Sequence, residues 1–131
     1  MKKLRGVNRI KLAKKPTYKS RVKELDRVFS IYIRRKENNV CFTCGSTKNS
    51  QCGHYVSRKY LSLRWDELNC HCQCSSCNIF KKGNMDEYAR KLELKYGFGI
   101  LQKLAEIKAK TVKYTVDELD ILIKHYTEKI K

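Results

Sequence analysis

Four of the seven cysteines form two close pairs, Cys41–Cys44 and Cys74–Cys77, with two residues between the members of each pair. This spacing lets both thiolates of a pair turn toward one metal ion, and two pairs complete a tetrahedral set of sulfur ligands. Four thiolates leave no open position for a substrate, so we expect one structural Zn²⁺ ion. A thioredoxin-like redox pair is the alternative reading, but neither pair lies in a βαβ pattern.

Polar residues that can carry chemistry lie around the second cysteine pair. His54, Asn69 and His71 precede this pair, and Asn78 follows it directly. A neutral imidazole can take a proton from water near neutral pH, and a carboxamide oxygen can bind a hard cation such as Mg²⁺. Such a cation would polarise a phosphate group and stabilise the leaving oxygen. The remaining cysteines are expected to be small buried or half-buried residues, and the alternative is that one of them replaces a zinc ligand: Cys52, Cys70 and Cys72.

The charge of the chain favours a polyanionic partner. The 131 residues carry a net charge of +17, and residues 1–36 hold 14 Lys and Arg against two acids. Nucleic acid is the first candidate, because contacts with phosphates offset the self-repulsion of such a segment. A merely solvated surface is the alternative, and a membrane surface is not expected. No signal peptide and no apolar run of about 20 residues is visible, so we expect a reducing cytoplasm.

Hydrophobic spacing indicates the elements that must position these residues. Apolar residues at helical intervals predict a helix over residues 20–37, with Ser20 as its N-cap. The cysteine-rich segment has no helical period, so we expect loops and a hairpin with strands at 55–63 and 68–73. A short helix should then begin near Cys74 and stop at Gly83.

Three further helices are predicted near residues 85–97, 100–107 and 115–130. The last helix carries apolar residues three and four positions apart, which either pack on the domain or pair with a second copy in a homodimer. The predicted fold class is α+β, with an N-terminal helix, a zinc-stapled ββα core and three C-terminal helices. The predicted parts are a flexible basic arm, the core and a helical extension: residues 1–19, 20–97 and 98–131.

These motifs resemble the HNH, or ββα-metal, nuclease fold. His54 matches its first motif position, Asn69 its middle position and Asn78 its last position. A wider set of segments resembles the phage NinG family, also called Rap, of recombination nucleases. The resemblance covers about residues 16–97 and rests on five stretches: LDRVFSIYIRR, CFTCG, CGHYVSR, LRWDELNCHCQCSSCN and KKGNMDEYARKL.

The resemblance implies a metal-dependent endonuclease that acts on branched recombination DNA, such as Holliday junctions or flap and Y-shaped DNA, in the cytoplasm of a phage-infected bacterium. His54 would be the general base, Asn69 would brace the hairpin, and Asn78 would bind the catalytic Mg²⁺ or Mn²⁺. Many HNH members carry Asp or His directly before the base as a second metal ligand, where this chain has Gly53. His71 and Asp66 are the candidates for the missing ligand, and the spacing places neither of them.

Basic residues on the hairpin and after the second cysteine pair are candidates for phosphate contacts: Arg58, Lys59, Arg64, Lys81 and Lys82. A solvated surface is an equally good reading for any one of them. The alternative function is a non-catalytic zinc module that binds nucleic acid, and the absence of a side chain at Gly53 favours it.

Overall fold

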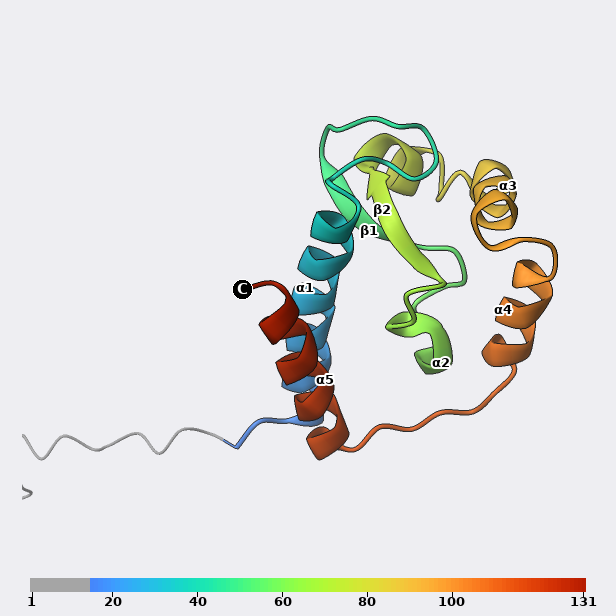
Figure 1. The fold of residues 1–131 in the computed structure, drawn as a ribbon. Helices are drawn as coiled ribbons and strands as arrows, with labels where there is room; N and C mark the ends of the chain where they lie inside the picture. Colours follow the sequence, from blue (N-terminus) through green and yellow to red (C-terminus); the bar gives the residue numbers. More distant parts are fainter. Residues whose placement is uncertain (1–14) are drawn as a thin grey trace, which may run out of the picture.

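The computed structural model describes residues 15–131, and the predicted basic arm lies largely outside them. Figure 1 shows a two-stranded sheet between a pair of long helices on one side and two shorter helices on the other. The elements in chain order are α1 (Tyr18–Lys36), β1 (Ser50–His54), α2 (Leu61–Arg64), β2 (Cys70–Cys74), the π-helical turn η1 (Ser76–Phe80), α3 (Met85–Tyr96), α4 (Ile100–Lys108) and α5 (Val116–Lys129). The predicted α+β fold class is confirmed.

Helix α1 begins two residues earlier than predicted, because Thr17 and not Ser20 is its N-cap. The Thr17 hydroxyl accepts a hydrogen bond from the Ser20 N–H at 3.1 Å, and the Ser20 hydroxyl accepts one from the Thr17 N–H at 3.0 Å. This reciprocal capping box satisfies two donors at the start of the helix. Residues 18 and 19, assigned to the arm from the sequence, therefore belong to α1.

Strands β1 and β2 form an antiparallel hairpin in which Cys52 pairs with Cys72 and His54 pairs with Cys70. The prediction of a strand over residues 55–63 is wrong, since β1 ends at His54 and α2 occupies part of that range. Tyr55–Tyr60 instead form the loop that leads into α2. The second strand lies one to two residues later than predicted and is buried along its whole length.

Two hydrophobic clusters flank the hairpin. The first joins α1 and α5 through buried residues that include Leu25, Phe29, Leu119 and Tyr126. Helices α1 and α5 run parallel, because Arg21 contacts Asp120 near their starts and Arg35 donates to the carbonyl of Ile130 near their ends. The apolar seam of the last helix therefore packs on the domain, as one of the two readings of the sequence predicted.

The second cluster lies on the other side of the hairpin, between α2, α3 and α4. Its buried members are Leu63, Tyr88, Leu92, Ile100 and Leu104. The two clusters hold the hairpin from both sides and so fix the strand residues that carry the polar groups. Among residues 15–131, no helix combines the length and the apolar composition that crossing a membrane requires.

Candidate active site and metal centres

The two cysteine pairs meet in one cluster. The sulfur atoms of Cys41, Cys44, Cys74 and Cys77 all lie within 4.8 Å of one another, and the Cys44 and Cys74 sulfurs are 3.6 Å apart. Zn–S bonds of about 2.3 Å in a tetrahedron require sulfur atoms roughly 3.8 Å apart, so the four thiols fit one Zn²⁺ ion. All seven cysteines are free of disulfide bonds.

Backbone geometry on each side directs the sulfurs toward this centre. The Cys44 N–H donates to the Cys41 sulfur and the Cys77 N–H donates to the Cys74 sulfur, each at 3.4 Å. Burial opposes ionisation of Cys41, but hydrogen bonds from Thr43 and from backbone N–H groups outweigh it and lower the pKa of this thiol to about 6. One ligand is therefore close to its metal-binding thiolate form at neutral pH.

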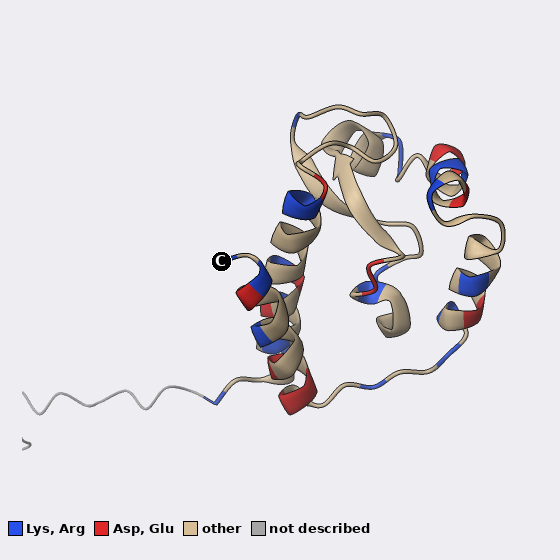
Figure 2. Cartoon of the chain, viewed as in Figure 1, with Lys and Arg blue, Asp and Glu red and all other residues tan. Residues whose placement is uncertain are grey.

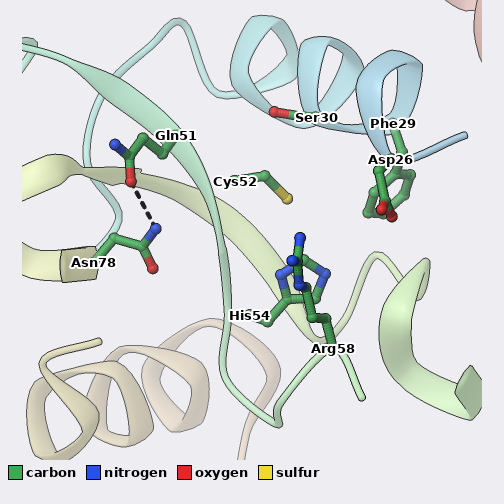
Figure 3. Close-up of a pocket in the computed structure, with 8 residues that line it drawn as sticks. All are labelled: Asp26, Phe29, Ser30, Gln51, Cys52, His54, Arg58 and Asn78. Carbon is green, nitrogen blue, oxygen red and sulfur yellow. Dashed lines mark hydrogen bonds between the residues drawn. The ribbon is translucent and has the colours of Figure 1, made fainter. Parts of the chain in front are cut away.

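A pocket lies between α1 and the hairpin, and Figure 3 shows the eight residues that line it. It contains two of the residues predicted to carry chemistry, His54 and Asn78. Gln51 and Cys52 come from β1, and Arg58 comes from the loop after it. Helix α1 contributes the remaining three residues: Asp26, Phe29 and Ser30.

His54 lies at the end of β1 with its ring fixed by one hydrogen bond. Its Nε2 atom is 2.8 Å from the carbonyl oxygen of Arg64, and a carbonyl oxygen can only accept. Nε2 therefore carries the proton, and Nδ1 keeps its lone pair. Burial lowers the pKa of His54 below its ordinary value, although the Arg64 carbonyl and the Asp26 carboxylate partly oppose this shift. The ring is neutral at neutral pH and can accept a proton.

Asn69 is fully buried and ties the loop after β1 to the start of β2. Its side-chain oxygen accepts from the Val56 N–H at 2.8 Å, and its amide nitrogen donates to the Val56 and Leu63 carbonyls at 3.0 and 3.1 Å. These three bonds use both ends of the carboxamide. The bonds hold the segment that carries the Arg64 carbonyl and therefore the orientation of the His54 ring. A bracing role for Asn69 agrees with this geometry, while its part in catalysis stays a prediction.

Asn78 lies in the middle of η1, where the sequence predicted an ordinary helix. Its amide nitrogen donates to the side-chain oxygen of Gln51 at 2.8 Å, which leaves the Asn78 side-chain oxygen free for a cation. Lys82 and Asn84 have φ values of 50° and 49°, so the chain leaves the helical conformation one turn after Asn78. Residue 82, four positions after Asn78, therefore does not lie beside it on one helical face, and its lysine side chain is not a metal ligand.

Packing disfavours any residue larger than glycine at position 53, directly before His54. A Cβ atom at Gly53 would lie 2.0 Å from the side-chain oxygen of Gln73. The Gln73 carboxamide is held there by hydrogen bonds from its nitrogen to the Thr43 hydroxyl at 3.2 Å and the Gly83 carbonyl at 2.9 Å. A side chain at position 53 would have to displace this carboxamide, so packing disfavours a metal-binding residue there.

His71 is not brought to the pocket. It is fully buried on the other face of the sheet, with Nδ1 2.6 Å from a Glu37 carboxylate oxygen and Nε2 3.3 Å from the Tyr96 hydroxyl. Its ring stacks on Phe42 with centroids 4.1 Å apart. Because both ring nitrogens have protein partners, the structure corrects the prediction that His71 joins Asn78 as a ligand of the catalytic metal.

The predicted phosphate contacts differ in their availability. Arg58, Lys59, Lys81 and Lys82 are exposed. Arg64 instead forms a bidentate salt bridge with Asp26, with N–O distances of 3.0 and 2.6 Å, so its guanidinium is engaged within the protein. Figure 2 shows basic residues directly after η1, along α1 and on the segment between α4 and α5.

Sequence reasoning missed several residues at this site. Asp26 and Gln51 line the pocket, and Phe80, at the end of η1 beside Lys81, is 80% exposed. An aromatic ring so exposed beside lysines suits contact with nucleic-acid bases. The exposure of Phe80 was not predictable, because residue 80 falls in the short helix expected between Cys74 and Gly83 and no apolar spacing marks the buried side of that segment. Asp26 and Gln51 come to the pocket only through the packing of α1 on the hairpin.

Comparisons with known proteins agree on one family. The family model described as "Bacteriophage Lambda NinG protein" matches residues 1–131. Proteins named "Protein ninG" from Salmonella phage P22 and Escherichia phage 933W are each 30% identical over 114 residues, which is 84% of this chain and 56% of the relative. The homologue from Escherichia phage lambda is 29% identical over 114 residues, 84% of this chain and 55% of its own. The chain thus spans about half the length of these relatives. No solved structure matches it.

Proposed function

The chain belongs to the NinG family of phage proteins, and on this premise we propose that it is a metal-dependent DNA endonuclease of the HNH type with one structural zinc ion. The observation that carries the proposal is the shared pocket of His54 and Asn78. There a neutral imidazole with an available lone pair lies on the same lining as an available carboxamide oxygen. A general base and a hard-cation ligand in one pocket are the groups that hydrolysis of a phosphodiester requires.

The chain's own residues would act as follows. His54 Nδ1 takes a proton from water, and the resulting hydroxide attacks the scissile phosphorus. The Arg64 carbonyl keeps the ring in the tautomer that this step needs. Arg58 lies on the pocket lining, where its positive charge would attract the DNA backbone. The P–O3′ bond then breaks and the O3′ oxygen takes a proton from solvent, which leaves a 5′-phosphate and a 3′-hydroxyl.

The carboxamide oxygen of Asn78 suits Mg²⁺ or Mn²⁺ rather than a metal that demands many protein ligands. Asn78 would hold the ion through one carboxamide oxygen, and Mg²⁺ commonly keeps several waters. When bound, the ion would neutralise charge on the phosphate and on the leaving oxygen. The four-cysteine cluster takes the structural role, because it fits a closed zinc site with no open position.

Branched recombination intermediates are the proposed substrates. This preference follows from the family resemblance, and the exposed Phe80 beside Lys81 supports it, because open or unpaired bases can stack on an aromatic ring. The exposed basic residues near the pocket would add salt-dependent affinity for any DNA.

The test is cleavage of end-labelled linear, flap, Y-shaped and four-way DNAs by the chain loaded with one equivalent of Zn²⁺, in Mg²⁺, in Mn²⁺ and in EDTA. We expect cleavage that requires the divalent cation and favours the branched DNAs. Asn78→Ala should lower cleavage while zinc content stays unchanged. Lys48→Ala is a matched control on the exposed surface outside the pocket lining.

A non-catalytic nucleic-acid module is the second candidate, and one observation favours it. This chain has Gly53 where many HNH members carry a second metal ligand, and packing against Gln73 disfavours a larger residue there, so the pocket has fewer ligands than many HNH sites. This candidate predicts binding of the same DNAs with no cleavage in either cation.

A further inference from the structure

A second cluster of side chains of types that can bind a metal ion lies at the wall of the pocket. The sulfurs of Cys52 and Cys70 and a ring nitrogen of His54 lie within 4.8 Å of one another. Cys52 and His54 are two residues apart on β1, and Cys70 is the direct partner of His54 on β2. Residues related in this way point to the same face of a hairpin, so the three side chains converge from two strands.

The chemistry of these three groups selects a particular class of metal ion. Two thiols and an imidazole suit Zn²⁺, whereas Mg²⁺ and Mn²⁺ prefer oxygen ligands. Three protein ligands leave a fourth position for water. Cys52 and His54 line the pocket, and Cys70 is fully buried behind them. An ion held by this set would therefore be reached from the same opening as the substrate.

The hydrogen bond of His54 is a second, independent indication of a ligand. Histidines that bind metals commonly donate their other ring N–H to a backbone carbonyl or a carboxylate, which fixes the tautomer. His54 makes such a bond from Nε2 to the Arg64 carbonyl at 2.8 Å, so Nδ1 is the ring atom left to bind an ion. The Cys70 sulfur lies 3.6 Å from the same carbonyl oxygen.

We propose that Cys52, His54 and Cys70 form a second zinc site, and that zinc bound there inhibits the nuclease by occupying the lone pair of His54. The inhibitory part rests on the proposed function, whereas the binding part does not. On binding, each thiol releases its proton to solvent and the imidazole contributes its lone pair while keeping its N–H. The neutral lone pair cannot serve a metal ion and a water proton at once.

Cys72 provides a matched control, because it is a fully buried cysteine on the same strand as Cys70 but lies outside the three-residue cluster. The metal-free full chain is titrated with Co²⁺, whose absorption reports thiolate ligands and tetrahedral geometry, and the ions per chain are counted. We expect two ions in the unmodified chain and in Cys72→Ala, and one ion in Cys52→Ser and in Cys70→Ala.

A single Co²⁺ ion in the unmodified chain would overturn the second site. Two ions in both Cys52→Ser and Cys70→Ala would also overturn it, because the second ion would then lie elsewhere. Cys52 is half-buried and Cys70 is fully buried. If Cys70→Ala does not fold, the comparison of Cys52→Ser with Cys72→Ala decides the question.

Inhibition is measured as a ratio within each variant. Cleavage in Mg²⁺ is compared with one and with two equivalents of Zn²⁺ per chain, and we expect the second equivalent to lower the rate at least tenfold in the unmodified chain but less than twofold in Cys52→Ser. Equal ratios would overturn the inhibition while leaving the metal count intact. Absence of cleavage under every condition would contradict the proposed nuclease, and the Co²⁺ count would still test the site.

Discussion

His54 and His71 lie on opposite faces of the same two-stranded sheet, and their surroundings differ in the features that decide what a histidine can do. His54 has one protein partner, the Arg64 carbonyl, and lines a pocket. His71 has partners on both nitrogens, Glu37 and Tyr96, and is fully buried. The residue type is the same, so the difference comes from what covers each face.

The cover of each face follows from the helices that pack on it. On the His54 side, α1 packs against the hairpin and leaves the pocket at their junction. On the His71 side, Phe42 and Tyr88 approach the ring with centroids 4.1 and 6.0 Å away. A ring enclosed in this way contributes to packing and hydrogen bonding, whereas a ring beside a pocket can also exchange a proton.

The largest expected effect is on cleavage by His54→Ala. Loss of a general base lowers the rate by about 10²–10⁴. The structural zinc ion of the four-cysteine cluster, the DNA affinity and the free energy of unfolding should change little, since the His54 ring makes one hydrogen bond and lines an open pocket. Single-turnover cleavage, metal analysis, DNA titration and urea unfolding measure these four quantities. Cleavage at the unmodified rate would remove His54 from the mechanism and favour the binding module.

His71→Ala should have the opposite profile. It removes a fully buried ring and leaves the Glu37 carboxylate without its partner, so we expect a loss of about 2–4 kcal/mol in the free energy of unfolding. Urea unfolding of the zinc-loaded protein gives this value. The folded fraction should cleave DNA at the unmodified rate. A rate loss like that of His54→Ala in fully folded protein would restore His71 as a metal ligand.

The sequence predicted the cysteine cluster and the two pocket residues well for a physical reason. Cysteine pairs with two intervening residues can meet only if the chain turns locally, so the spacing itself carries the geometry. His54 lies at the end of β1 and Asn78 lies in η1, and the cysteine cluster anchors the hairpin and this turn. The start of β1 was predicted too late, because residues 55–63 have a strand-like composition, but Asn69 ties Val56 into the loop after β1 and α2 begins at Leu61.

The face on which each strand residue lies was not predictable from local pattern. Strand β2 is buried on both faces, so the alternation of apolar and polar residues that usually identifies a face is missing. The sequence therefore could not show which face His71 occupies, and His71 stayed a candidate for the missing metal ligand until the register was known. Asp26 and Gln51 also reach the pocket only through tertiary packing, which no short sequence motif encodes.

Gly53→Ala tests how tightly position 53, next to His54, packs against the Gln73 side chain. The added methyl group would meet the Gln73 side chain, and overpacking of this kind costs about 1–3 kcal/mol. In a Gln73→Ala background the same substitution should cost clearly less, because the clashing carboxamide is gone. The double-mutant cycle is measured by urea unfolding. Additive losses would show that the clash is relieved in another way.

The smallest expected effect is a shift in the pH dependence of cleavage, and it follows from the environment of His54. Burial lowers the pKa of this imidazole below its ordinary value of 6.5, the Arg64 carbonyl and the Asp26 carboxylate act to raise it, and the charges of Arg58 and Arg64 act to lower it. His54 can act as the proposed base only when its ring is neutral, so the acid limb of the kcat/KM profile should have its midpoint below pH 6.5.

The same shift fixes the sign of a stability effect. Below pH 6.5 the unfolded chain takes up a proton on His54 more readily than the folded protein does, so stability is retained above 6.5 and falls as the pH drops through the lower folded pKa. His54→Ala removes this contribution and should flatten the fall in stability at low pH, whereas His71→Ala should leave the acid limb of cleavage in place.

Arg58→Gln removes one charge that disfavours the imidazolium and should move the midpoint of the acid limb of cleavage toward pH 6.5 by less than about one pH unit. A midpoint above 6.5 in the unmodified protein would assign the limb to a different group.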